Sequence, residues 1–311
     1  MHFQMKKQAE ETVFDAVIIG GSYAGLSAAM ALGRALRHVL VLDSGQPCNR
    51  QTPHSHNFLT QDGQTPAALA ELARTQVLAY PTVQLRQDTA VQATGTNHDF
   101  TVTTAAGLTV RTRKLLFATG IRDLLPTLPG LAECWGISVI HCPYCHGYEY
   151  HHQPTGILAN GDMAFEFSRL IRNWTDQLTI FTNGPATLQP AHREKLAALG
   201  VLVQETPVQR IMHQQGYLSQ VELANGSAMP LTAVYARVPF EQHCLLPRDL
   251  GCAYTEGGYL QVDDFQKTSV PGIYAAGDAT TMMRAVSGAV AAGGKAGAML
   301  NHELIAESVP A

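Results

Sequence analysis

The chain has 311 residues, which is long enough for two domains of ordinary size and a large buried core. Its 21 basic and 25 acidic residues give a net charge of −4, which favours neither nucleic acid nor an anionic membrane as a partner. Apolar residues make up 46% of the chain and charged residues 15%, a balance that is typical of an α/β enzyme and excludes a disordered or fibrous protein.

The first strong pattern follows a polar stretch, residues 1–12, for which we expect a mobile tail. A short apolar run at Val13–Ile19 is typical of a buried parallel strand. A glycine turn comes next, then apolar residues at helical spacing over Leu26–Leu36 and a second strand at Val39–Leu42. This order predicts a βαβ unit.

The uncharged stretch Ala16–Gly33 also has the composition of a membrane span or a signal peptide. However, Glu10, Glu11 and Asp15 stand where a signal peptide is basic, and a glycine turn interrupts the stretch. We therefore expect a soluble, cytoplasmic protein. Six cysteines without an export signal argue against a framework of disulfides.

Further elements follow in the same strand–turn–helix style. A hairpin from about Thr101 leads through Leu108–Arg113 into a strand at Lys114–Ala118, and a second βαβ unit comprises Gly156–Ala159, Met163–Asn173 and Gln177–Phe181. The chain ends with a strand at Ile273–Ala276, a turn and an Ala/Gly-rich helix at Val286–Glu303.

Two βαβ units in one chain predict an α/β fold with two Rossmann-like, doubly wound, three-layer domains. Prolines at positions 126, 129 and 239 punctuate the expected boundaries. We therefore predict one nucleotide-binding domain from residues 13–121 and 241–311, with a second domain, 122–240, inserted into it.

The turn Gly20-Gly21-Ser22-Tyr23-Ala24-Gly25 follows a strand and opens a helix, as a dinucleotide-binding turn does. Gly20 permits the tight turn, Gly25 lets the helix pack on the strand, and the free N–H groups of the helix start then face a pyrophosphate. Asp43, at the end of the next strand, would accept a hydrogen bond from a ribose hydroxyl. A purely structural glycine turn is the alternative.

The second turn, Ala159-Asn160-Gly161-Asp162-Met163-Ala164, keeps only one of the two leading glycines. Thr182-Asn183-Gly184 end its second strand, where a carboxylate would hold the ribose of NADH or arginines the 2′-phosphate of NADPH. His192 and Arg193 come about ten residues too late. We expect a domain retained for its shape more than for nucleotide binding.

The segment Cys142-Pro143-Tyr144-Cys145-His146 supplies the reactive groups. Two cysteines at this spacing can close a redox-active disulfide, a helix start lowers the pKa of a thiolate, and His146 can act as an acid or base near neutral pH. A zinc knuckle is the competing interpretation, because histidines also occur at 141, 151 and 152. It lacks a second paired set of ligands among the other cysteines, so we predict no metal site.

Together these residues resemble the low-molecular-weight thioredoxin reductase family over essentially the whole chain. The motifs that carry the resemblance are Ile18-Ile19-Gly20-Gly21 with Gly25, Ala118-Thr119-Gly120, Cys142-x-x-Cys145 and Thr268-Ser-Val-Pro-Gly-Ile-Tyr-Ala-Ala-Gly277-Asp278. The resemblance implies an FAD-binding first domain, a homodimer, Cys145 facing the flavin and Cys142 exchanging with substrate. It places Asp278 on the ribityl chain and the start of the last helix near the flavin.

The predicted FAD-binding residues combine the first turn with the segments that the resemblance adds. They are Gly20, Ser22, Tyr23, Ala24, Gly25, Asp43, Ser44, Arg50, Asn57, Ala118, Thr119, Gly120, Gly277, Asp278, Arg284, Ala285 and Val286.

Two departures from the family's reductases bear on function. His146 replaces the usual aspartate after the second cysteine, and the arginine-rich NADPH motif is missing. His146-Gly147-Tyr148-Glu149, Arg50 and the 56–63 stretch resemble instead the dithiol oxidases of gliotoxin and holomycin biosynthesis, and relatives that work without NADPH are a further comparison.

The leading hypothesis is therefore an FAD-dependent thiol-disulfide oxidoreductase, not driven by NADPH, that acts on a small dithiol or disulfide or on a thioredoxin-like protein. The alternatives are an NADPH-dependent disulfide reductase and a non-enzymatic zinc protein.

Overall fold

The computed structural model describes residues 13–308, which form two compact units. Unit 1 comprises the chain up to Cys48, Ala67–Arg122 and the chain from Gln242, and unit 2 comprises Asn49–Pro66 and Asp123–Glu241. The tail expected at 1–12 lies outside the described residues. Our sequence analysis assigned segment 49–66 to the first domain, whereas the structure groups it with unit 2.

Unit 1 is built on a mostly parallel sheet with the order β3-β2-β1-β6-β5-β4, and β17 also pairs with β6. Its strands are β1 (Val13–Ile19), β2 (Val39–Asp43), β3 (Val83–Gln87), β4 (Ala90–Thr96), β5 (Asp99–Thr104), β6 (Thr109–Phe117) and β17 (Ile273–Ala275). The strands β1, β2, β3, β6 and β17 run parallel, so their carboxyl ends meet at one edge of the sheet.

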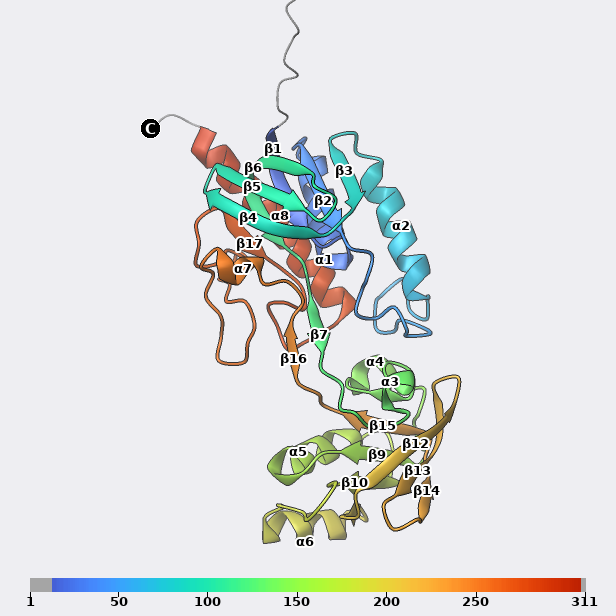
Figure 1. Ribbon diagram of the computed structural model, residues 1–311. Coiled ribbons are helices and arrows are strands. Elements are labelled where there is room, and N and C mark those ends of the chain that lie inside the picture. The colour runs from blue at the N-terminus through green and yellow to red at the C-terminus, as the bar shows by residue number, and fades with distance from the viewer. Residues whose placement is uncertain (1–12, 309–311) are drawn as a thin grey trace, which may run out of the picture. The chain divides into compact units, whose positions relative to one another are not determined.

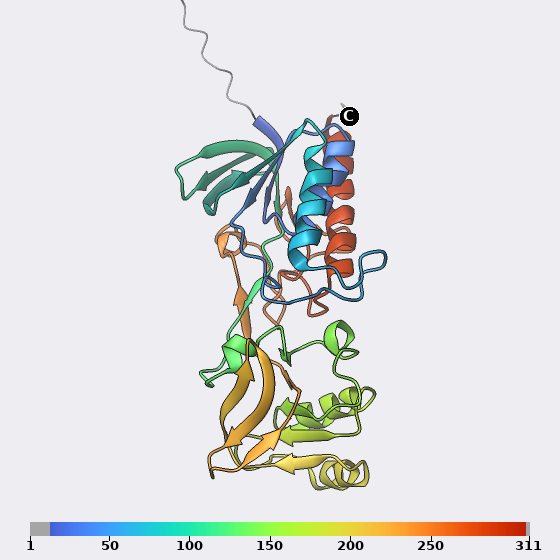
Figure 2. The same ribbon diagram turned by 90° about the vertical axis from the view of Figure 1, so that its right-hand side faces the viewer.

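Helices cover one face of this sheet, as Figure 2 shows for the long helices of unit 1. The helices of the unit are α1 (Tyr23–Arg34), α2 (Pro66–Leu78), α7 (Leu246–Asp249) and α8 (Val286–Ser308). Leu32 of α1 and Leu300 of α8 share a buried core with Ile18 of β1. A Cβ on Gly293 would lie 2.0 Å from the Ala24 carbonyl oxygen, so the two helices approach as closely as they do because this residue is glycine.

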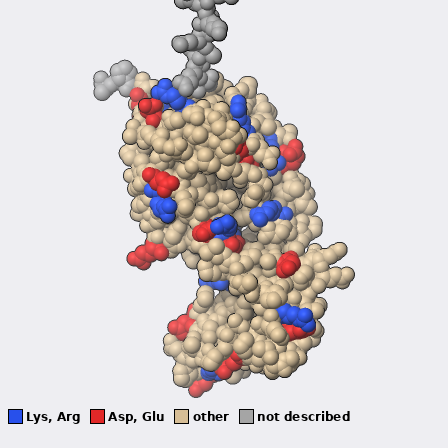
Figure 3. Space-filling view, viewed as in Figure 1, with Lys and Arg blue, Asp and Glu red and all other residues tan. Residues whose placement is uncertain are grey.

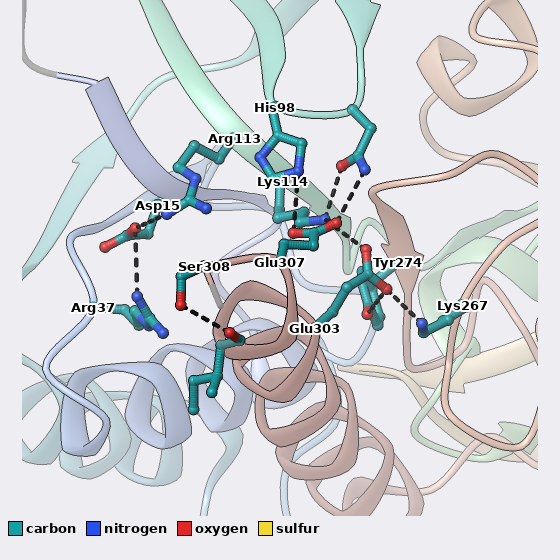
Figure 4. A network of polar contacts seen from close by, with 12 residues as sticks. Asp15, Arg37, His98, Arg113, Lys114, Lys267, Tyr274, Glu303, Glu307 and Ser308 are labelled. Atoms are coloured by element: carbon teal, nitrogen blue, oxygen red, sulfur yellow. Dashed lines mark hydrogen bonds and ion pairs between the residues drawn. The ribbon is translucent and has the colours of Figure 1, made fainter. Parts of the chain in front are cut away.

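A buried ion cluster ties α8 to the sheet (Figure 4). Lys114 of β6 is completely buried, and its Nζ lies 2.5 Å from Glu303, 2.7 Å from Glu307 and 2.8 Å from the side-chain oxygen of Asn97. Tyr274 donates to Glu303 at 2.8 Å, and Lys267 pairs with the same carboxylate. A charge this deeply buried is tolerated because acceptors surround it.

Unit 2 carries a second parallel sheet with the order β11-β10-β9-β15-β8, and a separate three-stranded antiparallel sheet, β12-β13-β14 (Figure 1). The strands are β8 (Val139–Ile140), β9 (Thr155–Leu158), β10 (Leu178–Phe181), β11 (Leu202–Gln204), β12 (Val208–Gln214), β13 (Tyr217–Leu223), β14 (Ala228–Pro230) and β15 (Ala233–Ala236). The helices are α3 (Leu131–Cys134), α4 (Pro143–His146), α5 (Gly161–Ile171) and α6 (Pro190–Ala198). The connections between the units include β7 (Ile121–Asp123) and β16 (Phe240–Gln242), which pair with each other.

The parallel sheet of unit 2 has a different core on each face. Phe181 and Val234 pack with Ile211 of the antiparallel sheet, whereas Ile157 and Tyr235 pack with residues of α5 and α6. Each unit is thus an α/β body of Rossmann-like layers, as the sequence predicts. Basic and acidic side chains are interspersed over the face that Figure 3 shows.

Candidate active site

The first dinucleotide turn lies at the carboxyl edge of the unit 1 sheet. Gly20 has a φ of +106°, and a Cβ there would lie 2.2 Å from the Ala118 carbonyl oxygen, so the turn needs glycine on both counts. A Cβ on Gly25 would come within 1.8 Å of the Gly20 carbonyl oxygen. The turn is therefore pressed between the start of α1 and the end of β6.

The start of α1 keeps its backbone donors available. The Ser22 side chain makes no capping hydrogen bond. Within the described residues, the first turn of α1 contains no acidic side chain. The helix dipole and the first N–H groups therefore offer an anion site.

The neighbouring strand ends bring the other predicted cofactor residues of unit 1 to the same edge. Asp43 ends β2, Ala118–Gly120 follow β6, and Gly277-Asp278 follow β17. The Thr119 hydroxyl is buried and has no hydrogen-bond partner among residues 13–308, and Asp278 Oδ2 lies 3.7 Å from Arg284 Nε. A turn that leaves no room for side chains, an open helix start and an unsatisfied hydroxyl fit a bound dinucleotide.

Two predicted FAD-binding residues belong to unit 2 and not to unit 1. Arg50 and Asn57 belong to segment 49–66 of unit 2, and both are exposed. Asn57 has a φ of +60°, and its N–H donates to Asp62 Oδ1 at 2.7 Å. Their roles at the flavin stay a prediction.

The second turn is closed by the chain's own side chains. Asn160 Oδ1 accepts hydrogen bonds from the N–H groups of Gly161 and Thr187, both at 2.8 Å. Its amide donates to the carbonyl of Pro185 at 2.9 Å, and Asp162 adds a carboxylate to the first turn of α5. One N–H at the start of α5 is thus engaged by the chain itself, and the first turn of the helix carries a carboxylate that disfavours an anion.

The basic residues near this turn are engaged as well. His192 stacks on Phe165 with ring centroids 3.8 Å apart, and its Nδ1 lies 3.2 Å from Asp162. Arg193 Nη2 lies 2.6 Å from Glu205 at the end of β11. The sequence analysis placed both residues too late for a phosphate clamp, and the structure gives each of them another partner.

The cysteine segment opens a short helix in unit 2. Cys142 is the N-cap of α4, and the N–H groups of Cys145 and His146 both lie 3.3 Å from its carbonyl oxygen. Both cysteines are partly exposed, whereas Pro143 and Gly147 are buried. A Cβ on Gly147 would lie 2.5 Å from the Pro143 carbonyl oxygen, so the close end of this turn requires glycine.

His146 is half-buried in the last turn of α4. Burial, and to a smaller extent the neighbouring charge of His56, lower its pKa to about 4. At neutral pH the imidazole is therefore uncharged, and it is a weaker base than the sequence predicts.

A group that the sequence analysis did not single out stands beside this histidine. His56 Nε2 lies 3.4 Å from Glu149 and its Nδ1 lies 3.5 Å from Asp62. The only signal in the sequence was the 56–63 stretch itself, because the pairing with Glu149 joins positions 93 residues apart and depends on the fold.

The histidines proposed as zinc ligands are dispersed. His141 stacks on Trp135, and His151 stacks on the exposed Tyr148. Among the residues that the structure describes, no group of three or more His, Cys, Asp or Glu side chains is placed to hold a metal ion.

Comparison with known proteins decides the family. The pyridine nucleotide-disulphide oxidoreductase family matches residues 14–293. The chain belongs to this family. Within it, the chain is 31% identical to thioredoxin reductase sirT of Leptosphaeria maculans, over 96% of this chain and 97% of that protein.

Solved structures agree with this family membership. A putative thioredoxin reductase TrxB from Bacillus anthracis superposes with a TM-score of 0.91 at 30% identity, covering 95% of this chain and all of that one. The structure of HlmI gives 0.89 at 35% identity, covering 95% and 93%. The protein is thus a thioredoxin reductase-like flavin oxidoreductase, a disulfide oxidoreductase of the pyridine nucleotide-disulphide type, and the non-enzymatic alternative is not supported.

Membership in the pyridine nucleotide-disulphide oxidoreductase family implies FAD as cofactor, and the unit 1 turn fits it. The N–H groups at the start of α1 would hold the pyrophosphate and Asp43 the ribose, while Thr119 and Asp278 offer further polar contacts. When bound, FAD supplies an acceptor and donor for electron pairs. No helix between residues 13 and 308 is both long and apolar enough to cross a membrane.

Proposed function

We propose that this protein is an FAD-dependent dithiol oxidase that works through a Cys142–Cys145 disulfide and does not draw electrons from NADPH. The observation that carries the proposal is the closed second turn, where Asn160 Oδ1 accepts a hydrogen bond from the Gly161 N–H and Asp162 adds a carboxylate to the first turn of α5. A nucleotide phosphate there would meet that carboxylate, and the nearby Arg193 is already paired with Glu205, so the turn offers a poor phosphate site.

The chemistry begins with a substrate dithiol. A substrate thiolate attacks the Cys142 sulfur, the Cys142–Cys145 bond breaks, and Cys145 leaves with the electron pair as a thiolate. The second substrate thiol then attacks the mixed disulfide, closing the substrate's own disulfide and releasing Cys142. The attacking thiol loses its proton to solvent, and neutral His146, which its lowered pKa makes a weak base, accepts a hydrogen bond from the thiol before that step.

The electron pair finally leaves through the cofactor. One substrate dithiol and one molecule of oxygen, or another two-electron acceptor, give one substrate disulfide and the reduced acceptor. His146 is the residue that distinguishes this chain from reductases with an aspartate at that position, so we propose that its neutral imidazole replaces that carboxylate beside the reacting thiols. A homodimer is expected from the family resemblance and stays a prediction.

The main competing function is an NADPH-dependent disulfide reductase of thioredoxin or a similar protein. It is favoured by the names of the relatives, among them thioredoxin reductase tcpT of Claviceps purpurea, 33% identical over 95% of each chain. It requires the second unit to bind NADPH despite the side chains that occupy its turn.

An anaerobic comparison of electron donors separates the two functions. The oxidised holoprotein is mixed with excess NADPH, and separately with dithiothreitol, while flavin absorbance is followed. We expect bleaching by dithiothreitol and little by NADPH. Rapid bleaching by micromolar NADPH contradicts the oxidase proposal. A Cys142→Ser variant, which cannot form the disulfide, should lose bleaching by the dithiol.

A further inference from the structure

Tyr235 is a buried tyrosine whose hydroxyl is not explained by the packing around it. It is the third residue of β15 and only 1% exposed, and its ring meets Phe167 edge-on at 5.8 Å between centroids. The hydroxyl is buried and has no hydrogen-bond partner among residues 13–308. Leaving such a group unsatisfied costs about 1–3 kcal/mol, a cost that phenylalanine would avoid.

The strand register places the Tyr235 side chain on the helix side of the sheet, beside the strand that leads into the cysteine segment. Tyr235 pairs with Ile140 of β8 on one side and Ile157 of β9 on the other, and all three share the core on the helix side of the sheet. In-register residues of parallel strands project to the same face. Cys142 follows Ile140 by two residues, so the cysteine segment begins directly after the strand that pairs with Tyr235.

The electrostatic surroundings agree with that placement. Burial raises the pKa of Tyr235, and Cys142, Glu149, Tyr150 and Cys145, in decreasing order, raise it further. The phenol therefore stays protonated at neutral pH, where it can donate a hydrogen bond.

We propose that the Tyr235 hydroxyl donates a hydrogen bond to the Cys142 sulfur when that sulfur becomes a thiolate. The proposal rests on the redox role given to Cys142–Cys145 above, but it holds in either direction of electron flow. When the second substrate thiolate attacks the mixed disulfide, a new S–S bond forms in the substrate. The bond to Cys142 breaks, and Cys142 takes the electron pair. A donor at Cys142 makes it a better leaving group.

The test measures the Cys142 thiol directly. In a Cys145→Ser background, the pH dependence of iodoacetamide alkylation is followed by mass spectrometry of the peptide that contains Cys142. Hydrogen bonds to charged groups contribute enough to shift a pKa by about one to two units, so Tyr235→Phe should raise the Cys142 pKa by about that amount. An unchanged Cys142 pKa in Tyr235→Phe overturns the proposal.

Tyr150→Phe is the matched control. Its hydroxyl already donates to the Ile137 carbonyl at 2.8 Å, so this change should lower thermal stability and leave the Cys142 pKa unaltered. Tyr235→Phe should show the reverse pattern, because it removes an unsatisfied group. If Tyr235→Phe does not fold, 3-fluorotyrosine at position 235 keeps the shape but is a stronger donor, and it should lower the Cys142 pKa. No change, or a rise, overturns the proposal.

Failure of the proposed function is recognised separately. In the wild-type holoprotein, Cys142 and Cys145 should interchange between dithiol and disulfide in dithiothreitol buffers, and Tyr235→Phe should shift the balance towards the disulfide by about tenfold or more. Wild-type protein that forms no such disulfide contradicts the redox role itself. A normal wild-type transition with no shift in Tyr235→Phe contradicts only the role of Tyr235.

Discussion

The two βαβ turns of the chain hold corresponding positions in their units and treat the start of the following helix in opposite ways. The Gly20–Gly25 turn leaves the first N–H groups of α1 without a side-chain cap. The Asn160–Ala164 turn covers the start of α5 with the Asn160 amide and adds the carboxylate of Asp162. The positive end of a helix attracts either a ligand or the chain's own polar groups. The βαβ architecture of a nucleotide-binding unit can therefore be kept while side chains of the unit itself take the place of the nucleotide at the helix start.

The largest effect is expected at the ion cluster of unit 1, whose lysine lies within β6 and pairs with Ala16 of β1. Lys114→Met removes the centre of the ion cluster and leaves Glu303 and Glu307 without their buried partner. Breaking such a pair costs about 3 kcal/mol, so we expect a clear loss of stability in urea unfolding followed by fluorescence. Lys295→Met, at an exposed position on α8, is the control and should have little effect.

The same cluster predicts a dependence on acid. Although burial alone would raise it, hydrogen bonds from Lys114, Lys267 and Tyr274 lower the pKa of Glu303 to about 2. Because the folded value lies below the unfolded value of 4.5, this stabilisation is complete above pH 4.5 and is lost as the pH falls towards 2. In Lys114→Met the folded pKa of Glu303 should move closer to 4.5, so the unfolding free energy should fall less between pH 4.5 and 2; an equal fall in both proteins would contradict this role.

The difference between the two turns can be tested most directly by adding a side chain to the Gly20–Gly25 turn. Gly25→Ala places a Cβ within 1.8 Å of the Gly20 carbonyl oxygen. Because this oxygen belongs to the backbone, the turn itself must move to accommodate the new methyl group. Overpacking of about 1–3 kcal/mol, where it displaces the turn from the pyrophosphate, corresponds to about five- to 150-fold weaker FAD binding. The flavin-to-protein absorbance ratio after gel filtration measures it. Gly257→Ala, where the nearest atom would be a tyrosine side chain at 3.4 Å, should retain full flavin.

A smaller effect is expected when the closed turn is opened. Asn160→Ala removes the acceptor of two backbone N–H groups and should lower the stability of unit 2 by about 1–2 kcal/mol, measured as a lower Tm. Affinity for NADPH should stay low, because Asp162 and Glu205 remain. Asn173→Ala, on an exposed side chain, is the control. Unchanged stability in Asn160→Ala would mean that the side chain does not close the turn.

The smallest effect concerns the histidine beside the cysteines. Burial is the main cause of the low pKa of His146 and the charge of His56 is the second, so His56→Asn should raise that pKa by less than about one unit. Histidine NMR signals followed against pH give the value. A fall in the His146 pKa would show that His56 stabilises the charged imidazole instead.

Much of the fold could be predicted because its signals are local. The strands at Val13–Ile19 and Val39–Leu42 and the last helix were recognised from apolar periodicity, and the structure has them as β1, β2 and α8 with ends shifted by a few residues. The hairpin strand and Lys114–Ala118 proved to be one strand, β6. The antiparallel sheet of unit 2 was not predicted, since its short strands are specified by their partners more than by their own residues.

The candidate site also combines features with a local sequence signal and features that depend on the fold. The glycine turn and the cysteine pair are contiguous in sequence and could be recognised as motifs. The contacts around them join distant positions, as Lys114 does with α8, His56 with Glu149 and Tyr235 with Ile140 of β8. A lysine in a strand gives no sign in the sequence that it will be fully buried.

The packing of α8 on α1 has a consequence for synthesis on the ribosome. Residues 123–241 leave the ribosome as a continuous stretch, and nearly all of unit 2 is then available to fold. Unit 1 must wait, because Leu300 and Leu304 near the end of the chain complete the core that Leu32 begins. Unit 1, which carries the open nucleotide turn, is thus the last unit to complete its core. A ribosome that stalls before α8 would release a chain in which unit 2 is folded and unit 1 is not.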